Sequence, residues 1–198
     1  SAPTALAASD GTSTSGVVLT WTAAPGAVRY KVFRGVGAAS TDITPATPLI
    51  TTNTFTDTTA VAGTIYTYAV KAVGPTGVLD SAASAVNTGW RNVTPPALSA
   101  SDGTSATQVT ITWAARSDIA GFKIFRALGS AAPTQLGSTL VGTATSLVDT
   151  TAIAGTVYTY TCVAVTAAGD SSSSAAETGY RALSAPTALA ASDGTSTS

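Results

Sequence analysis

The sequence contains an internal repeat, and this repeat limits the chain to an architecture in which one folding unit occurs twice. Residues 8–13 (ASDGTS) recur 92 positions later as residues 100–105. At the same offset, residues 57–68 recur as residues 149–160, with two conservative changes. Each copy has the length of a small domain. We therefore predict two homologous modules, residues 1–92 and residues 93–183, joined by a short linker that its prolines stiffen.

A second repeat spans both modules. Residues 184–198 are identical to residues 1–15, whereas the start of the second module matches them less well. The repeat period is then 183 residues, because residue 184 corresponds to residue 1. We expect residues 184–198 to be the first strand and turn of a following module in a longer array. The alternative is a local duplication of one short segment.

Apolar residues alternate with polar ones, which predicts strands rather than helices. Val17, Leu19 and Trp21 share one parity, and Ile111 and Trp113 repeat the pattern in the second module. Threonine is frequent within these segments, and its branched side chain suits a pleated sheet. Asp-Gly and Pro-Gly pairs separate the segments as turns. About seven short strands per module predict an all-β protein built from β-sandwiches.

The composition excludes several classes of function. Only 10% of the residues are charged, the net charge is −1, and there is no histidine. Nine Lys and Arg residues are too few for a basic surface that binds nucleic acid. No apolar segment is long enough for a membrane-spanning helix. The bias toward Ala, Thr and Ser, together with few Lys and Glu residues, is typical of secreted and surface proteins of bacteria, which favours an extracellular location or the cell surface.

Several segments of each module resemble the fibronectin type III domains of bacterial extracellular proteins. These segments are a proline-containing first strand, a tryptophan in the second strand, residues 30–34 (YKVFR) with their repeat at 122–126, and the AGTxYxY motif. The resemblance implies a seven-stranded sandwich, with strands A, B and E in one sheet and C, C′, F and G in the other. It also implies that the corner tyrosine of the family falls on Tyr66 and Tyr158.

The expected core follows from strand parity and from this resemblance. A tryptophan fills the space of about 10 Å between two sheets better than a small side chain does. The single cysteine lies in a strand pattern and shares the parity of two tyrosines, so we expect a buried, unreactive thiol. The predicted core residues are Trp21, Trp113, Tyr66, Tyr158, Tyr68, Tyr160 and Cys162.

The sequence offers no catalytic group, and we expect no enzymatic activity, no cofactor and no metal site. Carboxylates are few and scattered, and Asp10 and Asp102 precede glycines in turns. Asp57 and Asp149 open the turn before strand F, where a local capping role is expected. A calcium site at the module junction is the alternative for such aspartates, but no cluster of carboxylates supplies enough oxygen ligands.

Four aromatic residues are candidates for packing between modules or chains. Phe33 and Phe125 are out of phase with the core residues and are expected on the outer face of the C–F–G sheet. Trp90 and Tyr180 precede the junctions and are expected to wedge successive modules together. Isolated exposed aromatics and a sugar-stacking surface are the alternatives for Phe33 and Phe125.

Two segments fit glycosylation patterns. Residues 51–59 form the densest run of hydroxyl side chains, which suits either a threonine-rich strand and turn or a set of O-glycosylation sites. Asn92-Val93-Thr94 fits the short N-glycosylation motif. Surface glycans are therefore possible partners.

The repeat and the lack of catalytic groups favour a structural function. We expect a repeat unit of a long extracellular tandem array, such as a surface filament, a stalk or an adhesin shaft. Its partners would then be neighbouring modules or head-to-tail copies of itself. The alternative is a spacer or binding region of a secreted polysaccharide-degrading enzyme.

Overall fold

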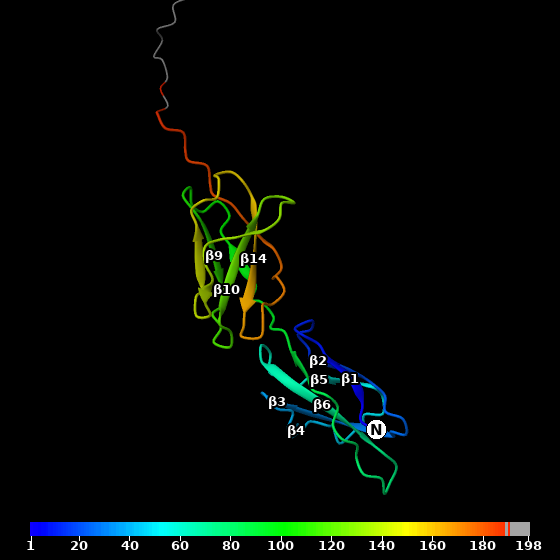
Figure 1. Cartoon of the computed structure of the whole chain (residues 1–198). Helices are drawn as coiled ribbons and strands as arrows, with labels where there is room; N and C mark the ends of the chain where they lie inside the picture. Colours follow the sequence, from blue (N-terminus) through cyan, green and yellow to red (C-terminus); the bar gives the residue numbers. More distant parts are fainter. Residues whose placement is uncertain (189, 191–198) are drawn as a thin grey trace, which may run out of the picture.

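The computed structural model describes residues 1–188 and residue 190, and their regular structure consists of strands alone. The strands form two β-sandwiches that lie end to end (Figure 1). The N-terminus lies at the end of the first sandwich that faces away from the second. The chain after residue 183 leaves the second sandwich at its opposite end (Figure 1). In the described part of the chain, no helix has the length and hydrophobicity needed to cross a membrane.

The first domain has two antiparallel sheets of three and four strands. The three-stranded sheet has the order β1-β2-β5, and the four-stranded sheet has the order β4-β3-β6-β7. This is the arrangement of seven strands that the resemblance implied. The bounds are β1 (Thr4–Ala8), β2 (Val17–Thr22), β3 (Arg29–Gly35), β4 (Thr41–Asp42), β5 (Thr54–Asp57), β6 (Ile65–Val73) and β7 (Asn87–Trp90).

The second domain repeats this topology with one additional short strand. Its sheets have the orders β8-β9-β13 and β11-β10-β14-β15, and β12 pairs with β10 beside β11. The bounds are β8 (Leu98–Ala100), β9 (Val109–Trp113), β10 (Gly121–Ala127), β11 (Thr134–Gln135), β12 (Leu140–Val141), β13 (Ser146–Asp149), β14 (Tyr158–Val165) and β15 (Glu177–Gly179). The first domain has only the isolated bridge Tyr30↔Ile50 where Phe122 pairs with Leu140 in the second. The two domains therefore differ by one residue pair at this sheet edge.

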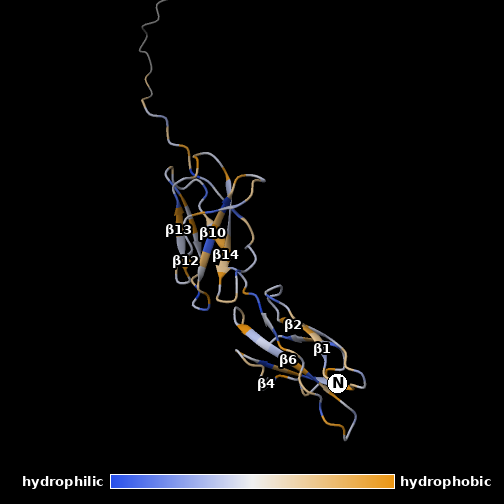
Figure 2. Ribbon diagram, in the orientation of Figure 1, coloured by the Kyte–Doolittle hydropathy of each residue, from blue (hydrophilic) through white to orange (hydrophobic). Residues whose placement is uncertain are grey.

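The alternation in the sequence becomes the burial pattern of the strands. In β2, Val17, Leu19 and Trp21 are buried and the residues between them are exposed. Trp21 packs edge-on against Tyr30 with ring centroids 5.1 Å apart, and Trp113 packs in the same way against Phe122 at 5.6 Å. Figure 2 shows apolar and polar residues interspersed along the strands of both domains. Each domain consequently has a core of its own, and the two cores share no residue.

The seven residues expected in the core are all buried. Tyr68, Tyr160 and Cys162 have no exposed surface, and the remaining four are at most 9% exposed. Burial raises the pKa of the Cys162 thiol to about 11, so the thiol stays protonated and unreactive at neutral pH. The indole nitrogens of both core tryptophans are buried without a hydrogen-bond partner among the described residues. Each tryptophan therefore contributes packing at the cost of one unpaired donor.

The central strand β6 is buried on both faces, which strict alternation does not predict. Thr67 and Ala69 lie on its outer face but are only 8% and 4% exposed. Phe33 pairs with Ala69 across the β3–β6 ladder, and residues paired in this way lie on the same face. The Phe33 ring therefore covers part of the outer face of this sheet. Lys71 Nζ lies 5.3 Å from the centroid of this ring.

Candidate functional site

A buried ion pair connects the two sheets of the first domain. Arg34 in β3 donates from Nη1 to Oδ2 of Asp57 at the end of β5, at 2.7 Å. Tyr68 in β6 donates its hydroxyl to the same oxygen at 3.0 Å, and Thr59 donates twice to Oδ1. The guanidinium also stacks on Tyr66, 4.5 Å from its ring centroid. The cluster thus ties three strands together at the position where one sheet passes over the other.

The electrostatics of this cluster keep Asp57 ionised. Burial by itself would raise the pKa of Asp57, whose side chain is 1% exposed. The hydrogen bonds from Thr59, Arg34 and Tyr68, together with the positive charge of Arg34, outweigh this effect and lower the pKa below its ordinary value. For Tyr68, burial and the nearby carboxylate both raise the pKa. Asp57 is therefore a charged anchor, and Tyr68 is a neutral donor.

The second domain repeats the cluster and adds one bond, from the Ala152 amide to Oδ1 of Asp149 at 3.1 Å. Arg126 Nη1 lies 2.8 Å from Oδ2 of Asp149, and Tyr160 donates to the same oxygen at 3.0 Å. Thr151 caps Oδ1 as Thr59 does in the first domain. The Arg126 guanidinium lies over Tyr158, and the hydroxyl of Tyr158 accepts a long bond from the Ile153 amide. Both oxygens of each carboxylate accept hydrogen bonds from within the same domain, as in a structural ion pair.

The described residues contain no group of three or more Cys, Asp or Glu side chains that could hold a metal ion. Asp57 and Asp149 have the local capping role that the sequence suggested, and each also forms an ion pair with an arginine 23 positions earlier. Sequence analysis missed this arginine–aspartate pairing. A usable signal was present, because the arginine, the aspartate and the tyrosine all recur at the same spacing in both modules.

The linker between the domains is tied into both of them. The side-chain amide of Asn92 donates to the carbonyl oxygen of Gly11 at 2.7 Å, and its Oδ1 accepts the Val93 amide at 2.8 Å. From the second domain, Arg116 donates to the carbonyl oxygen of Thr94. Val93 is 1% exposed although it belongs to neither core. The junction is therefore packed, and the amide of Asn92 is buried and bonded rather than presented for glycosylation.

The two domains contact each other closely at two glycines. A Cβ at Gly169 of the second domain would lie 2.8 Å from Cζ2 of Trp90, and a Cβ at Gly63 of the first would lie 3.0 Å from Cγ2 of Thr166. Real side chains do not tolerate the first distance and tolerate the second only if the neighbour yields. Trp90 thus lies between its own domain and the next one.

An arginine fastens the end of each domain. Arg91 donates from Nε to the carbonyl oxygen of Thr14 at 2.6 Å and reaches two further carbonyl oxygens with Nη1. Arg181 does the same at the end of the second domain, with Nε 3.0 Å from the carbonyl oxygen of Ala106. These bonds satisfy backbone acceptors where the last strand leaves each sandwich. The two domain ends therefore share the same arginine–carbonyl contacts.

Among the described residues, every aromatic side chain is buried or half-buried. Phe33, Phe125, Trp90 and Tyr180 are all half-buried, and the large hydrophobic residues exposed on the described part of the chain are aliphatic. Phe125 pairs with Thr161 on the second domain as Phe33 pairs with Ala69 on the first. The threonine-rich run at residues 51–59 forms β5 and its turn, and all six of its threonines are exposed.

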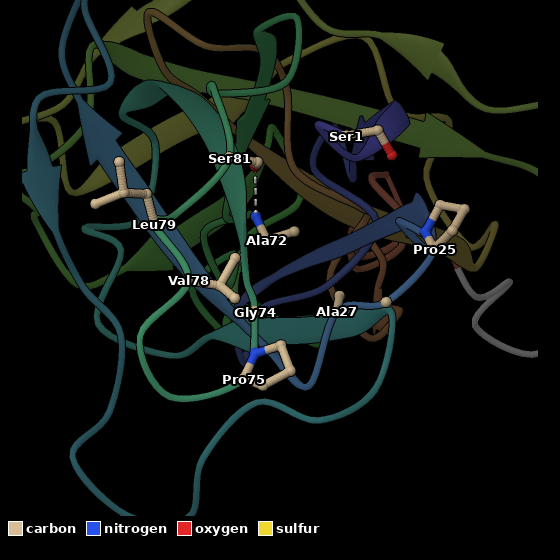
Figure 3. A pocket seen from close by; sticks show the side chains of 10 residues that line it. Ser1, Pro25, Ala27, Ala72, Gly74, Pro75, Val78, Leu79 and Ser81 are labelled. Carbon is tan, nitrogen blue, oxygen red and sulfur yellow. Dashed lines mark hydrogen bonds between the residues drawn. The ribbon is translucent and has the colours of Figure 1, made fainter.

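Hollows flank the free end of the first domain and the junction. A hollow of about 280 Å³ lies between residues 74–81 and residues 25–27, with Val78 and Pro75 on one side and Pro25 and Ala27 on the other (Figure 3). A groove of about 410 Å³ follows the linker residues 94–97 and is closed by Thr14 from one domain and residues 172–175 from the other. Both are shallow and lined mainly by small side chains.

The predicted first strand of a following module lies mostly outside the described residues. Residues 184–188 are described as exposed and without regular structure. Residue 189 and residues 191–198, which include two of the five residues that repeat β1 and all of the following turn, are not described.

Comparison with solved structures defines the class of protein. A two-domain fibronectin type III segment of chicken tenascin superposes with a TM-score of 0.63 and 19% identity, covering 90% of this chain and 98% of that one. Together with the A-B-E and C′-C-F-G sheets, this similarity establishes the fold. The chain has the fibronectin type III fold, present twice in tandem.

Sequence comparison adds relatives from two bacteria. The chain is 35% identical over 185 residues to exoglucanase B of Cellulomonas fimi, covering 85% of this chain. It is 28% identical over 178 residues to chitinase A1 of Niallia circulans, covering 83% of this chain. The chain spans only 15% and 23% of the length of these two relatives. No protein-family model matches the chain.

Proposed function

We propose that the chain is a non-catalytic, rod-like connector in a secreted polysaccharide-degrading enzyme. The observation that carries this proposal is the packed junction, in which Val93 is 1% exposed and Trp90 lies against the next domain. A packed junction fixes the distance and direction between whatever is attached at the two ends. A flexible linker of the same number of residues fixes neither.

The relatives support this proposal over a filament. The two relatives are named as an exoglucanase and a chitinase, and the chain matches a minor part of each. Such a part agrees with an accessory segment placed beside a catalytic domain. An extracellular location follows for this chain under the same proposal.

The surface supports a spacer over a carbohydrate-binding module. Carbohydrate recognition favours flat, accessible aromatic rings, whereas the exposed large hydrophobic residues of the described chain are valine, leucine and isoleucine. The carboxylates that are most deeply buried, Asp57 and Asp149, are bonded within their own domains. The connector function therefore needs the shape of the chain and no ligand of its own.

A chimeric enzyme tests the proposal. Residues 1–198 are placed between a cellulase catalytic domain and a cellulose-binding domain, and a flexible Gly/Ser linker of equal length serves as the control. We expect the chimera with this chain to hydrolyse crystalline cellulose faster than the control, with equal rates on a soluble substrate. Equal rates on both substrates would contradict the connector function. If cellulose or chitin removes the isolated chain from solution, the chain binds polysaccharide, and a binding function replaces the connector function.

A repeat unit of an extracellular array is the second candidate, because residues 184–198 repeat residues 1–15 without a change. Tryptic digestion of the native protein separates the two candidates. A covalent array with the 183-residue period yields a peptide that starts at Ala182, runs through Ser198 and continues with residues 16–29. Peptides from a glycosidase domain in the same polypeptide identify the connector instead.

A further inference from the structure

The second domain ends on a surface that repeats the surface by which the first domain holds its neighbour. In the first domain, the Gly63 amide donates to the carbonyl oxygen of Arg91 at 2.8 Å. In the second domain, the Gly155 amide donates to the carbonyl oxygen of Arg181 at 2.9 Å. Tyr180 occupies the place of Trp90, and both aromatic rings lie over a glycine of the turn after the first strand of their domain. The same arrangement of a backbone hydrogen bond and an aromatic ring, which we call the junction frame, is thus present at the end of each domain.

Among the described residues, one of the two junction frames is covered and the other is exposed. Val93 is 1% exposed, whereas its equivalent Leu183 is 74% exposed. Thr166 of the neighbouring domain lies over Gly63, but over Gly155 the nearest atoms belong to Leu183 itself, 2.9 Å from a Cβ built there. The second domain therefore presents an apolar residue at the position where the first domain buries one against its neighbour.

The first domain presents an apolar segment at the end that faces away from the second domain. This segment, residues 74–80 at the start of the β6–β7 loop, exposes Val78 by 59% and Leu79 by 91%. It corresponds to residues 166–170 at the start of the β14–β15 loop, where Thr166 and Gly169 contact the first domain. The two segments end at the same point of the fold, because Asp80 pairs with Lys31 and Asp170 pairs with Lys123, both at 2.6 Å. The segment of the first domain is therefore two residues longer and more apolar.

The sizes of the loops match the aromatic residues that would meet them. At the existing junction, the short loop, with Gly169 at the contact, faces the large indole of Trp90. At the end of the second domain, the smaller ring of Tyr180 leaves more room, and the longer loop with Val78 and Leu79 would fill it. Directly after Leu183, the chain repeats residues 1–15, with which the first domain begins.

We propose that the end of the second domain, formed by Gly155, Tyr180 and Leu183, docks the first domain of a second copy of this chain, which enters through its β6–β7 loop. Docking places Leu183 in the buried position that Val93 has at the existing junction. The contact is head-to-tail and joins different surfaces, so it continues from copy to copy in one direction. The inference goes beyond the connector function, and its test involves no enzyme and no carbohydrate.

Thiol labelling at position 183 tests the docking. Leu183→Cys is made in residues 1–198 and in an extended chain, in which residues 1–183 are followed by a second copy of residues 1–92. The linkage supplies the second copy at an effective concentration of about 1 mM. We expect Cys at this position to react with a maleimide at least about tenfold more slowly in the extended chain, the protection that a docked population of about 90% gives. Equal rates in the two chains overturn the proposal.

Reference variants calibrate the rates. Val93→Cys reports the buried junction, and Val141→Cys, at a residue that is 66% exposed, reports a freely reacting surface thiol. The native Cys162 is fully buried and contributes a slow background. Since Leu183 and Val141 are both exposed, neither substitution removes core packing, and circular dichroism verifies the fold.

Two further chains test which loop makes the contact. Val78→Ser with Leu79→Ser in the appended copy is expected to restore fast labelling at position 183, because the apolar contact is lost. If protection persists, the β6–β7 loop is not the docking element and the proposal fails. An extended chain that ends with a second copy of residues 93–183 carries the short loop instead, and we expect weaker protection. Equal protection by the two appended domains would contradict the match between loop length and aromatic ring. The end of the second domain would then bind either domain without selectivity.

Discussion

At the scale of single residues, the most informative feature is the buried carboxylate in each domain. Asp57 and Asp149 are 1% and 3% exposed, yet each is ionised beside an arginine, a tyrosine and a threonine. A buried carboxylate tolerates its desolvation only when all of its acceptor positions are used. Arg34 also stacks on Tyr66 and Arg126 on Tyr158, a second tyrosine in each domain, so each cluster sets the positions of five side chains together.

Removal of one carboxylate is expected to destabilise its domain. Asp149→Asn leaves the Arg126 guanidinium and the Tyr160 hydroxyl without their charged acceptor. We expect the free energy of unfolding of the second domain to fall by about 3 kcal/mol, the lower end for a broken buried pair, since Arg126 retains contact with solvent. Urea denaturation measures the change. Asp170→Asn breaks the exposed pair with Lys123 and serves as the matched control, with an expected change below about 1 kcal/mol.

The same carboxylates determine the response to acid. Their pKa values are lower in the folded chain than the ordinary value of 3.8, so the unfolded chain binds protons first as the pH falls. Their contribution to stability is complete above about pH 5, well above the unfolded pKa, and is lost as the pH falls through the folded pKa values. Urea midpoints between pH 7 and pH 2 are expected to decrease below about pH 5. The double variant Asp57→Asn, Asp149→Asn is expected to show a flatter acid limb, and an unchanged slope would contradict this assignment.

At the scale of elements, the longer strands such as β2 and β9 follow from alternation because one face of each is buried, whereas the two-residue strands β4 and β11 are exposed. β2 and β9 carry a tryptophan at the same position, and each tryptophan packs against a single aromatic residue in the opposite sheet. The central strand β6 departs from alternation because Phe33, in the neighbouring strand β3, shares its outer face. Strand parity thus predicts the inner face of a sheet more reliably than its outer face.

The core tryptophan of one domain can be removed without affecting the other domain. Trp113→Ala leaves a cavity between β9 and β10, and we expect a loss of about 3–5 kcal/mol, which is comparable to the total stability of a small domain. The two cores share no residue, so only the second domain should unfold earlier. Calorimetry is expected to resolve two transitions, with the one that belongs to the first domain at its original temperature. A shift of both transitions by equal amounts would show that the domains unfold as one unit.

Sequence analysis predicted the β-sandwich but not the ion pair that joins its two sheets, and the reason is physical. Alternation at Val17, Leu19 and Trp21 reports a half-buried strand directly, since it depends on neighbours two positions apart. The bond between Arg34 and Asp57 joins strands from different sheets, and parity says nothing about pairing across sheets. The additional strand β12 has two residues, too few for any periodic signal.

At the scale of the whole molecule, the junction is the feature that turns two domains into one rod. Its contacts come from both domains and from the linker, including Trp90 against Gly169 and the bonded amide of Asn92. The lack of bulky residues at Gly63 and Gly169 is what permits the close approach. Sequence analysis made Trp90 a candidate for packing between modules from its position before the linker, but the two glycines carry no sequence pattern that indicates a partner in another domain.

Weakening the junction is expected to bend the rod while leaving both domains folded. Trp90→Ala removes the ring between the domains, and Gly169→Val adds a side chain where a Cβ would already lie 2.8 Å from that ring. Spin labels at Val86→Cys in the first domain and Val141→Cys in the second, both at exposed positions, report the distance between the domains. We expect a narrow distance distribution for the parent chain and a broad one for either variant.

Tyr180→Ala is the matched control, because it alters the equivalent ring at the far end of the second domain and should leave the distance distribution narrow. A parent distribution as broad as that of the variants would mean that the contacts of Trp90 do not hold the domains in line, and the connector would then act as a flexible tether rather than a spacer of fixed length.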